Sequence, residues 1–179
     1  TRGMEPLRGF PEFMRAAAAA QQAFPHLQVV VFGNDRAAYG FQSPHESGSW
    51  KQYMLDELEG QLDLARLHFT GLLNYGELVQ LFRRSDLHCY FTRPYVVSWG
   101  VFQAAACGAR LLVNNFPGID EVFASQFEAV VIDLDHQVLI DRAIIKLLKS
   151  GKKGQVRSNL AEGMELPASI MKWLNLISH

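Results

Sequence analysis

The order of apolar and polar positions along the chain predicts an alternation of helices and strands. From residue 10 to 24 the apolar side chains recur at helical spacing with one polar interruption, Gln21, and Pro25 follows. A helix is therefore predicted here, ending before the proline. The apolar, β-branched run 27–33 is typical of a short strand that is covered on both faces.

The same alternation continues to residue 148. Capping pairs, Ser49 with Gln52 and Asn74 with Glu77, indicate where two helices begin. Further strands are predicted at 66–71, 87–92, 110–113 and 129–132, and further helices at 49–58, 74–82, 99–108, 119–123 and 137–148. Because parallel strands need a helix-length crossover, the chain is predicted to be an α/β domain, a doubly wound parallel sheet with helices on both faces.

The predicted domain spans residues 1–150. After the stretch 150–154, which is rich in lysine and glycine, residues 151–179 are expected to form a helical extension of the same domain. In an open parallel sheet the ligand lies beyond the carboxyl ends of the strands, so the loops after residues 2, 33, 71, 92 and 114 should line one edge. Residues in these loops are therefore the first candidates for a binding site.

The first of these loops carries two arginines, Arg2 and Arg8, between glycines that let the backbone approach a ligand. The planar guanidinium group suits phosphate oxygens, so two such groups could hold a diphosphate and neutralise charge as it leaves. Two solvated surface arginines explain the pattern equally well.

Ser98 precedes an apolar helix and can cap it, which would leave the amides of Trp99, Gly100 and Val101 at the positive end of the helix dipole. Such an end binds anions, although most capped helices bind no ligand. The Gly-Pro loop 115–121 is open to the same two interpretations. Its amides either meet a ligand or only turn the chain.

Gln103 is the polar residue of a helix that is otherwise filled by small and apolar side chains. Its amide could hydrogen-bond a ribose or the backbone of a neighbouring loop. From the residues alone the second role is favoured, because most polar groups near an interior serve the structure.

Composition excludes several classes of function. The net charge is −1 and nearly half of the residues are apolar (49%), so neither a disordered tail nor a nucleic-acid binder held by bulk positive charge is expected. No histidine pair has helical ligand spacing, and no P-loop, dinucleotide glycine motif or hydrolase elbow is present, so no metal and no cofactor is expected.

The two cysteines, Cys89 and Cys107, lie in apolar runs and are expected to be unpaired thiols in the cytoplasm. The chain shows neither a signal peptide nor a stretch of eighteen apolar residues. Any membrane contact of the full-length protein would therefore be peripheral.

The sequence resembles the C-terminal, donor-binding domain of the group-1 glycosyltransferases, retaining enzymes with two Rossmann-like domains. The most specific segment, 103–113 (QAAACGARLLV), is similar to the family's E-A-M-A-C-G-x-P-V-V, and 116–122 (FPGIDEV) is similar to its G-G-x-x-E-V. The loop 2–10 is similar to the family's diphosphate loop, and 67–78 is similar to its base-binding strand, loop and helix. These matches follow the family's order over almost the whole chain.

Two departures concern the donor site. The family carries two glutamates here, one near the donor sugar and one on the ribose, and this sequence has Tyr95 and Gln103 at those positions. Segment 93–99 (RPYVVSW) resembles a branch of the family that lacks the first glutamate. Replacing the second weakens a ribose contact, because a hydrogen bond to a charged group contributes about 1.5–3 kcal/mol and a neutral one about 0.5–1.5.

The resemblance implies a hexosyltransferase-type activity that transfers a sugar, with retention, from a nucleotide diphosphate-sugar to an unknown acceptor. It implies that Arg2 and Arg8 stabilise the leaving diphosphate and that Gln103 meets the ribose. The remaining implied contacts are made by Gly71, Leu72 and Leu73 to the base, and by Ser98, Trp99, Gly100, Gly118 and Ile119 to phosphate and sugar. The family's N-terminal, acceptor-binding domain would be the partner of this chain, without which no transfer is expected. A catalytically degenerate domain that binds a nucleotide or a protein partner is the alternative.

Overall fold

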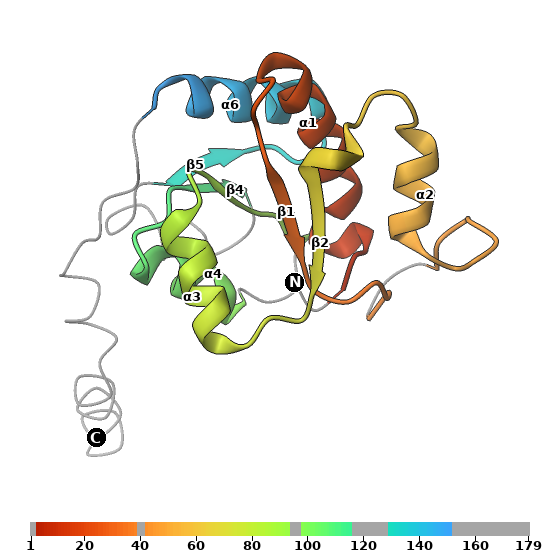
Figure 1. Cartoon of the computed structure of the whole chain (residues 1–179), viewed down its shortest axis with the longest axis horizontal. Helices are drawn as coiled ribbons and strands as arrows, with labels where there is room; N and C mark the ends of the chain where they lie inside the picture. The colour runs from red at the N-terminus through yellow and green to blue at the C-terminus, as the bar shows by residue number, and fades with distance from the viewer. Residues whose placement is uncertain (1–2, 39–41, 94–97, 116–128, 152–179) are drawn as a thin grey trace, which may run out of the picture.

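A computed structural model of the protein describes residues 3–38, 42–93, 98–115 and 129–151 (Figure 1). The elements follow in the order η1 (Pro6–Arg8), α1 (Phe10–Ala23), β1 (Val29–Phe32), α2 (Trp50–Glu57), η2 (Leu64–Arg66), β2 (Leu67–Gly71), α3 (Tyr75–Arg84), β3 (His88–Tyr90), α4 (Trp99–Ala106), β4 (Leu111–Asn114), β5 (Ala129–Ile132) and α6 (Gln137–Lys149). The predicted alternation is confirmed over these ranges. The helix predicted at 119–123 and the extension beyond 151 lie outside the described residues.

All described strand pairs are parallel, as predicted. β1 pairs with β2, and β4 lies between β3 and β5, so the five strands form two hydrogen-bonded sets rather than one continuous ladder. The two sets meet through side chains: the ring of Phe32 at the end of β1 stacks on that of His88 in β3, with ring centroids 6.2 Å apart.

Helices cover both faces of the β3–β4–β5 sheet, and β4 shows how. Leu111 and Val113 pack with Phe82 of α3 and with α4, whereas Leu112 packs with α1 and α6 on the other side. Successive residues of a strand point to opposite faces, so an uninterrupted apolar strand is what a sheet covered on both sides requires. The doubly wound arrangement is therefore confirmed.

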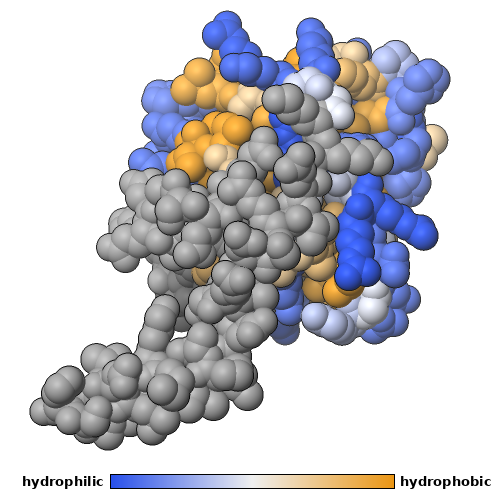
Figure 2. Space-filling view, turned by 90° about the vertical axis from the view of Figure 1, so that its left-hand side faces the viewer, coloured by the Kyte–Doolittle hydropathy of each residue, from blue (hydrophilic) through white to orange (hydrophobic). Residues whose placement is uncertain are grey.

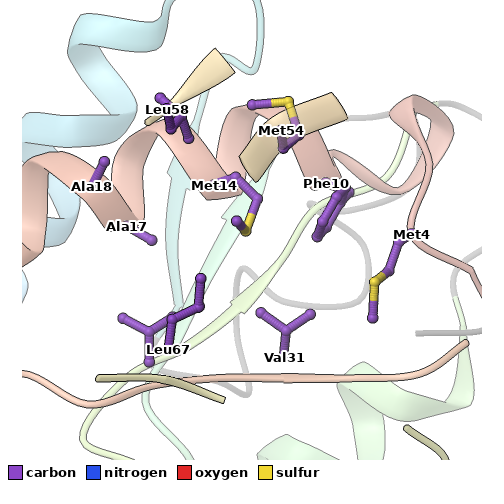
Figure 3. Close-up of a cluster of buried hydrophobic side chains, with 10 residues drawn as sticks. Met4, Phe10, Met14, Ala17, Ala18, Val31, Met54, Leu58 and Leu67 are labelled. Atoms are coloured by element: carbon purple, nitrogen blue, oxygen red, sulfur yellow. The ribbon is translucent and has the colours of Figure 1, made fainter. Parts of the chain in front are cut away.

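The apolar stripe of α1 packs on β1, β2 and α2 (Figure 3). Phe10, Met14 and Ala17 of this stripe are buried there. Gln21, the polar interruption, is buried as well, and its amide oxygen and nitrogen bond the backbone N–H and C=O of Asp63 at 2.9 and 3.3 Å. The backbone of a single loop residue thus satisfies both hydrogen-bonding groups of this buried polar side chain.

Both predicted helix caps are present, but only one is reciprocal. Asn74 and Glu77 each bond the other's backbone amide, at 3.0 and 2.9 Å, and form a complete capping box at α3. Ser49 accepts from the amide of Gln52 at α2, but the Gln52 side chain donates to Asp56 instead. A carboxylate one turn further along the helix is the stronger acceptor for that amide group.

The helix α4 ends at Ala106, and Gly108 follows with φ 77°. The left-handed residue that follows the helix is therefore a glycine, at the position where the sequence predicts the helix to end. Cys89 and Cys107 are free thiols, and burial raises the pKa of Cys89 to about 12. Neither cysteine therefore forms a disulfide, as expected.

The imidazole of His88 lies between Phe32 and Phe82, and burial lowers its pKa from 6.5 to about 4. The unfolded chain takes up this proton as the pH falls through 6.5, whereas the folded chain does not until about pH 4. The free energy of unfolding should therefore decrease by about 2–3 kcal/mol between these two pH values. Urea unfolding across this range measures the loss.

His88→Phe keeps a ring in this position and removes the titrating group, so it should flatten this part of the pH profile. The matched control is His26→Gln, at an exposed position, which should leave the profile unchanged. An equal slope in wild type and His88→Phe would show that His88 does not cause the loss.

On the face shown in Figure 2, hydrophobic residues of the described surface gather in patches among hydrophilic ones. The exposed large hydrophobic side chains of the described residues are Leu64, Leu72, Tyr75, Trp99, Val130, Val131, Val138 and Leu139.

Within the described stretches no helix has both the length and the apolar character needed to cross a membrane.

Candidate functional site

Backbone hydrogen bonds gather the predicted loops at the carboxyl ends of the strands. The amide of Gly33, just after β1, donates to the carbonyl of Gly71 at the end of β2 at 2.8 Å, and the amide of Met4 donates to the carbonyl of Asn34 at 3.1 Å. The loop before α1 therefore lies beside the end of β1. This edge is where an open parallel sheet binds its ligands.

The arginine loop rests on the segment that follows β3. Its turn, η1, is followed by Gly9 in the left-handed conformation with φ 59°. A Cβ at Gly9 would lie 2.3 Å from the Cβ of Phe91, so the close contact requires glycine. The amide of Arg93 donates to the carbonyl of Leu7 at 2.9 Å. The loop is thus fixed against the segment after β3 on both sides of Arg8.

Arg8 is a partly buried arginine whose charge no described carboxylate neutralises. Its Nη1 donates to the hydroxyl of Thr92 at 3.4 Å, and its Nε is buried without a partner among the described residues. Arg93, only one position past Thr92, shows the opposite situation, with ion pairs of 2.7 Å to Glu12 and to Asp135. Arg93 ties α1 to the loop after β5, whereas Arg8 makes no ion pair with a described residue.

The Arg93 pair also affects the carboxylate beyond β5. The guanidinium group, through its hydrogen bond, holds the pKa of Asp135 below its ordinary value of 3.8. The same hydrogen bond raises the pKa of Arg93. Both groups therefore stay charged at neutral pH.

The start of α4 is fixed to β3 through Ser98. Its amide donates to the Tyr90 hydroxyl at 2.9 Å, and its own hydroxyl accepts from the amide of Gly100 at 3.1 Å. The amide of Val101 donates to the carbonyl of Ser98 at 3.3 Å. The prediction of three free amides is therefore wrong for Gly100 and Val101, because the cap uses both. The Trp99 amide donates to no described residue, and Trp99 is 77% exposed.

Gln103 lies one turn after Trp99 on α4 and is half-buried. Residues four apart on a helix are neighbours on its surface, so Gln103 follows the start of α4 on the same side. In the part of the chain that the structure describes, the side-chain amide of Gln103 makes no hydrogen bond. The bond to a loop backbone that the residues alone favoured is therefore not made with any described residue.

The predicted base-binding loop follows β2. Gly71 has φ 69°, and apart from its chain neighbours no atom of a described residue lies within 4 Å of the position that a Cβ would take there. Leu72 is exposed, Leu73 is half-buried, and the capped start of α3 comes next. The space on the Cβ side of Gly71 is therefore not filled by the described residues. Its role in binding a base stays a prediction.

Four of the candidate residues or departures lie outside the described residues: Arg2, Tyr95, Gly118 and Ile119. Three residues that sequence reasoning did not single out belong to the site's framework, namely Tyr90, Thr92 and Asn114. Each is a polar residue at or just past the end of an apolar strand. This position, at the ligand-binding edge, is the signal that could have identified them.

Among the described residues no group of three or more histidine, cysteine, aspartate or glutamate side chains could hold a metal ion. Arg8 and the positive end of α4 are groups of the kind that suit an anion.

Comparisons with known proteins agree on one family. The family model described as glycosyl transferase-like matches residues 8–152. An uncharacterised glycosyltransferase of Methanocaldococcus jannaschii is 24% identical over 97 residues, which are 54% of this chain and 25% of that protein.

Solved structures show the same fold. The pneumococcal O-GlcNAc transferase in complex with UDP and GlcNAc gives a TM-score of 0.69 at 13% identity, over 98% of this chain and 34% of that one. The C-terminal domain of a group-1 glycosyl transferase from Francisella tularensis gives 0.66 at 14%, over 96% and 81%. Sucrose-phosphate synthase of Thermosynechococcus elongatus gives 0.67 at 12%, over 98% and 44%. This chain therefore spans about a third of the transferase compared first and a quarter of the archaeal relative.

Proposed function

Because the chain belongs to the glycosyl transferase-like family, we propose that it is the donor-binding part of a glycosyltransferase. The enzyme transfers a sugar, of hexosyl type, from a nucleoside diphosphate-sugar to an acceptor and retains the configuration at the anomeric carbon. The acceptor is bound by a further part of the protein, which corresponds to the remaining length of the relatives. The free thiols of Cys89 and Cys107 favour a reducing compartment such as the cytosol.

The observation that carries this proposal is the unneutralised charge of Arg8. A partly buried guanidinium group without an ion pair among the described residues is costly unless an anion completes it. In a transferase of this kind the anion is the diphosphate, which gains negative charge as the bond to the sugar breaks. Arg8 then stabilises the leaving group, and Arg2, Gly118 and Ile119 supply further contacts.

The start of α4 supports the same role for the diphosphate. The Trp99 amide and the dipole of the helix favour an anion, and Ser98 and Gly100 hold this turn in place. Gln103, one turn along, meets the ribose, and the backbone of residues 71–73 meets the base. The transferase from pneumococcus, with the same fold, is a complex with UDP, which supports a nucleoside diphosphate as the ligand.

Turnover is tested with the full-length protein and a panel of UDP-, GDP- and ADP-linked hexoses. We expect release of the nucleoside diphosphate from at least one donor, and NMR of the sugar product should show the donor's anomeric configuration. A product of inverted configuration would contradict retention. No release from any donor, with diphosphate binding intact, would contradict the transferase and leave a domain that only binds.

Gln103→Glu should tighten binding of the cognate nucleoside diphosphate about threefold to tenfold. A carboxylate accepts the ribose hydroxyl hydrogen bonds more strongly than a neutral amide does. Calorimetry measures the change. The matched control is Gln80→Glu, at an exposed position of α3, which adds the same charge away from the proposed ribose contact.

A second ligand separates the ribose contact from a general charge effect. The 2′,3′-dideoxy form of the same diphosphate lacks the hydroxyl groups, so Gln103→Glu should not improve its binding. If Gln103→Glu tightens both ligands equally, or neither, the ribose role of Gln103 is wrong.

A further inference from the structure

Thr92 lies between the arginine loop and the sheet. The residue is 1% exposed and follows β3, just where the paired part of that strand has ended. Its hydroxyl accepts from Nη1 of Arg8 at 3.4 Å and donates to the carbonyl of Arg93 at 3.1 Å. Thr92 is thus the described residue whose side chain contacts the guanidinium group of Arg8.

The backbone of Thr92 is fixed by a side chain of the neighbouring strand. Asn114, which is 2% exposed, accepts from the Thr92 amide and donates to the Thr92 carbonyl, both at 2.8 Å. Backbone pairing between β3 and β4 ends at Tyr90 and Val113. The Asn114 side chain therefore holds the backbone of Thr92, two residues past the last paired residue of β3, and sets the position from which the Thr92 hydroxyl projects.

The hydroxyl has one proton and two lone pairs. Because the proton goes to the Arg93 carbonyl, the side toward Arg8 is an acceptor. A neutral acceptor can orient a guanidinium group without cancelling its charge, whereas a carboxylate in this place would form an ion pair and compete with a bound anion. At 3.4 Å the bond from Arg8 to Thr92 is a long hydrogen bond.

We propose that Thr92 is a positioning residue that orients Arg8 toward the diphosphate and leaves its positive charge available, while Asn114 fixes Thr92. This inference rests on the proposed function, since the diphosphate is the ligand of that same site. The inference goes further, because it explains how a partly buried arginine is held in place by a neutral hydroxyl and not by a carboxylate.

Thr92→Val and Thr92→Ser test the proposal by calorimetry. The probe is whichever of UDP, GDP and ADP binds the wild-type protein, with its parent nucleoside titrated by NMR. Thr92→Val has the same shape but no acceptor, so it should weaken diphosphate binding about threefold to tenfold and change nucleoside binding less than twofold. Thr92→Ser keeps the hydroxyl and should bind the diphosphate within about twofold of wild type.

A double-mutant cycle with Arg8→Ala measures the coupling between Thr92 and Arg8 in diphosphate binding. A merely structural role of Thr92 would not produce such a coupling. If Thr92 acts through Arg8, Thr92→Val should cause no further loss in the Arg8→Ala background. Unchanged diphosphate binding in Thr92→Val, an equal loss for the nucleoside, or full additivity with Arg8→Ala would each overturn the inference. These results would leave the proposed function intact. If no diphosphate binds the wild-type protein, the proposed function fails and the inference falls with it.

Circular dichroism and urea unfolding of each variant show whether it is folded. Should Thr92→Val fail to fold, the comparison of Thr92→Ser with Thr92→Ala decides instead. Serine should then bind the diphosphate at least threefold more tightly than alanine, and equal binding would overturn the inference.

Discussion

Gly9→Ala is expected to lower the free energy of unfolding by about 2–5 kcal/mol. Gly9 has φ 59°, which costs about 1–2 kcal/mol for a residue with a Cβ. The new methyl group would also lie 2.3 Å from the Cβ of Phe91, a buried residue that cannot move aside cheaply. Overpacking of this kind costs a further 1–3 kcal/mol or so. The midpoint and slope of urea unfolding measure the sum.

Gly60→Ala separates the two contributions. Gly60 has φ 73°, and no atom lies within 4 Å of a Cβ placed there, so this variant should show the backbone cost alone. A loss in Gly9→Ala no greater than that in Gly60→Ala would show that the arginine loop is not packed against the segment after β3 as described.

Arg8→Ala is expected to weaken nucleoside diphosphate binding about tenfold to hundredfold and to change nucleoside binding little. The guanidinium group offers charge-assisted hydrogen bonds to phosphate oxygens, which contribute about 1.5–3 kcal/mol. Because no described carboxylate pairs with Arg8, its removal breaks no ion pair among those residues. Calorimetry with the diphosphate and NMR with the nucleoside measure the two affinities.

The matched control for Arg8→Ala is Arg83→Ala. Arg83 is exposed in the last turn of α3, at the opposite edge of the sheet from the candidate site, and its removal changes the net charge by the same amount. Equal losses in the two variants would mean that long-range charge, and not a contact to the diphosphate, explains the effect.

The sequence predicted the helices and strands well where local chemistry decides the outcome. Asn74 and Glu77 form the predicted box because both partners lie within one turn. Gln21 shows the limit of such local reasoning. Its position on an apolar stripe predicted burial of that face, but its partner, the backbone of Asp63, lies 42 residues away and no local pattern indicates it.

The candidate site was harder to predict because its framework depends on contacts between loops. The arginine pattern identified Arg8 but not whether its charge would be neutralised, since that depends on where every carboxylate lies. Thr92 and Asn114 are ordinary polar residues until the parallel pairing of β3 and β4 places them side by side. Three amides at the start of α4 were predicted to be free for an anion. Two of them, those of Gly100 and Val101, instead donate to Ser98, the residue that caps the helix.

Titration of the wild-type protein with UDP, GDP and ADP by calorimetry tests the central claim most directly. If the edge that carries Arg8 and the start of α4 is a donor site, at least one diphosphate should bind with a dissociation constant below about 1 mM, a binding free energy near −4 kcal/mol. The parent nucleoside should bind more weakly. No heat of binding from any of the three diphosphates at millimolar concentration would contradict the account.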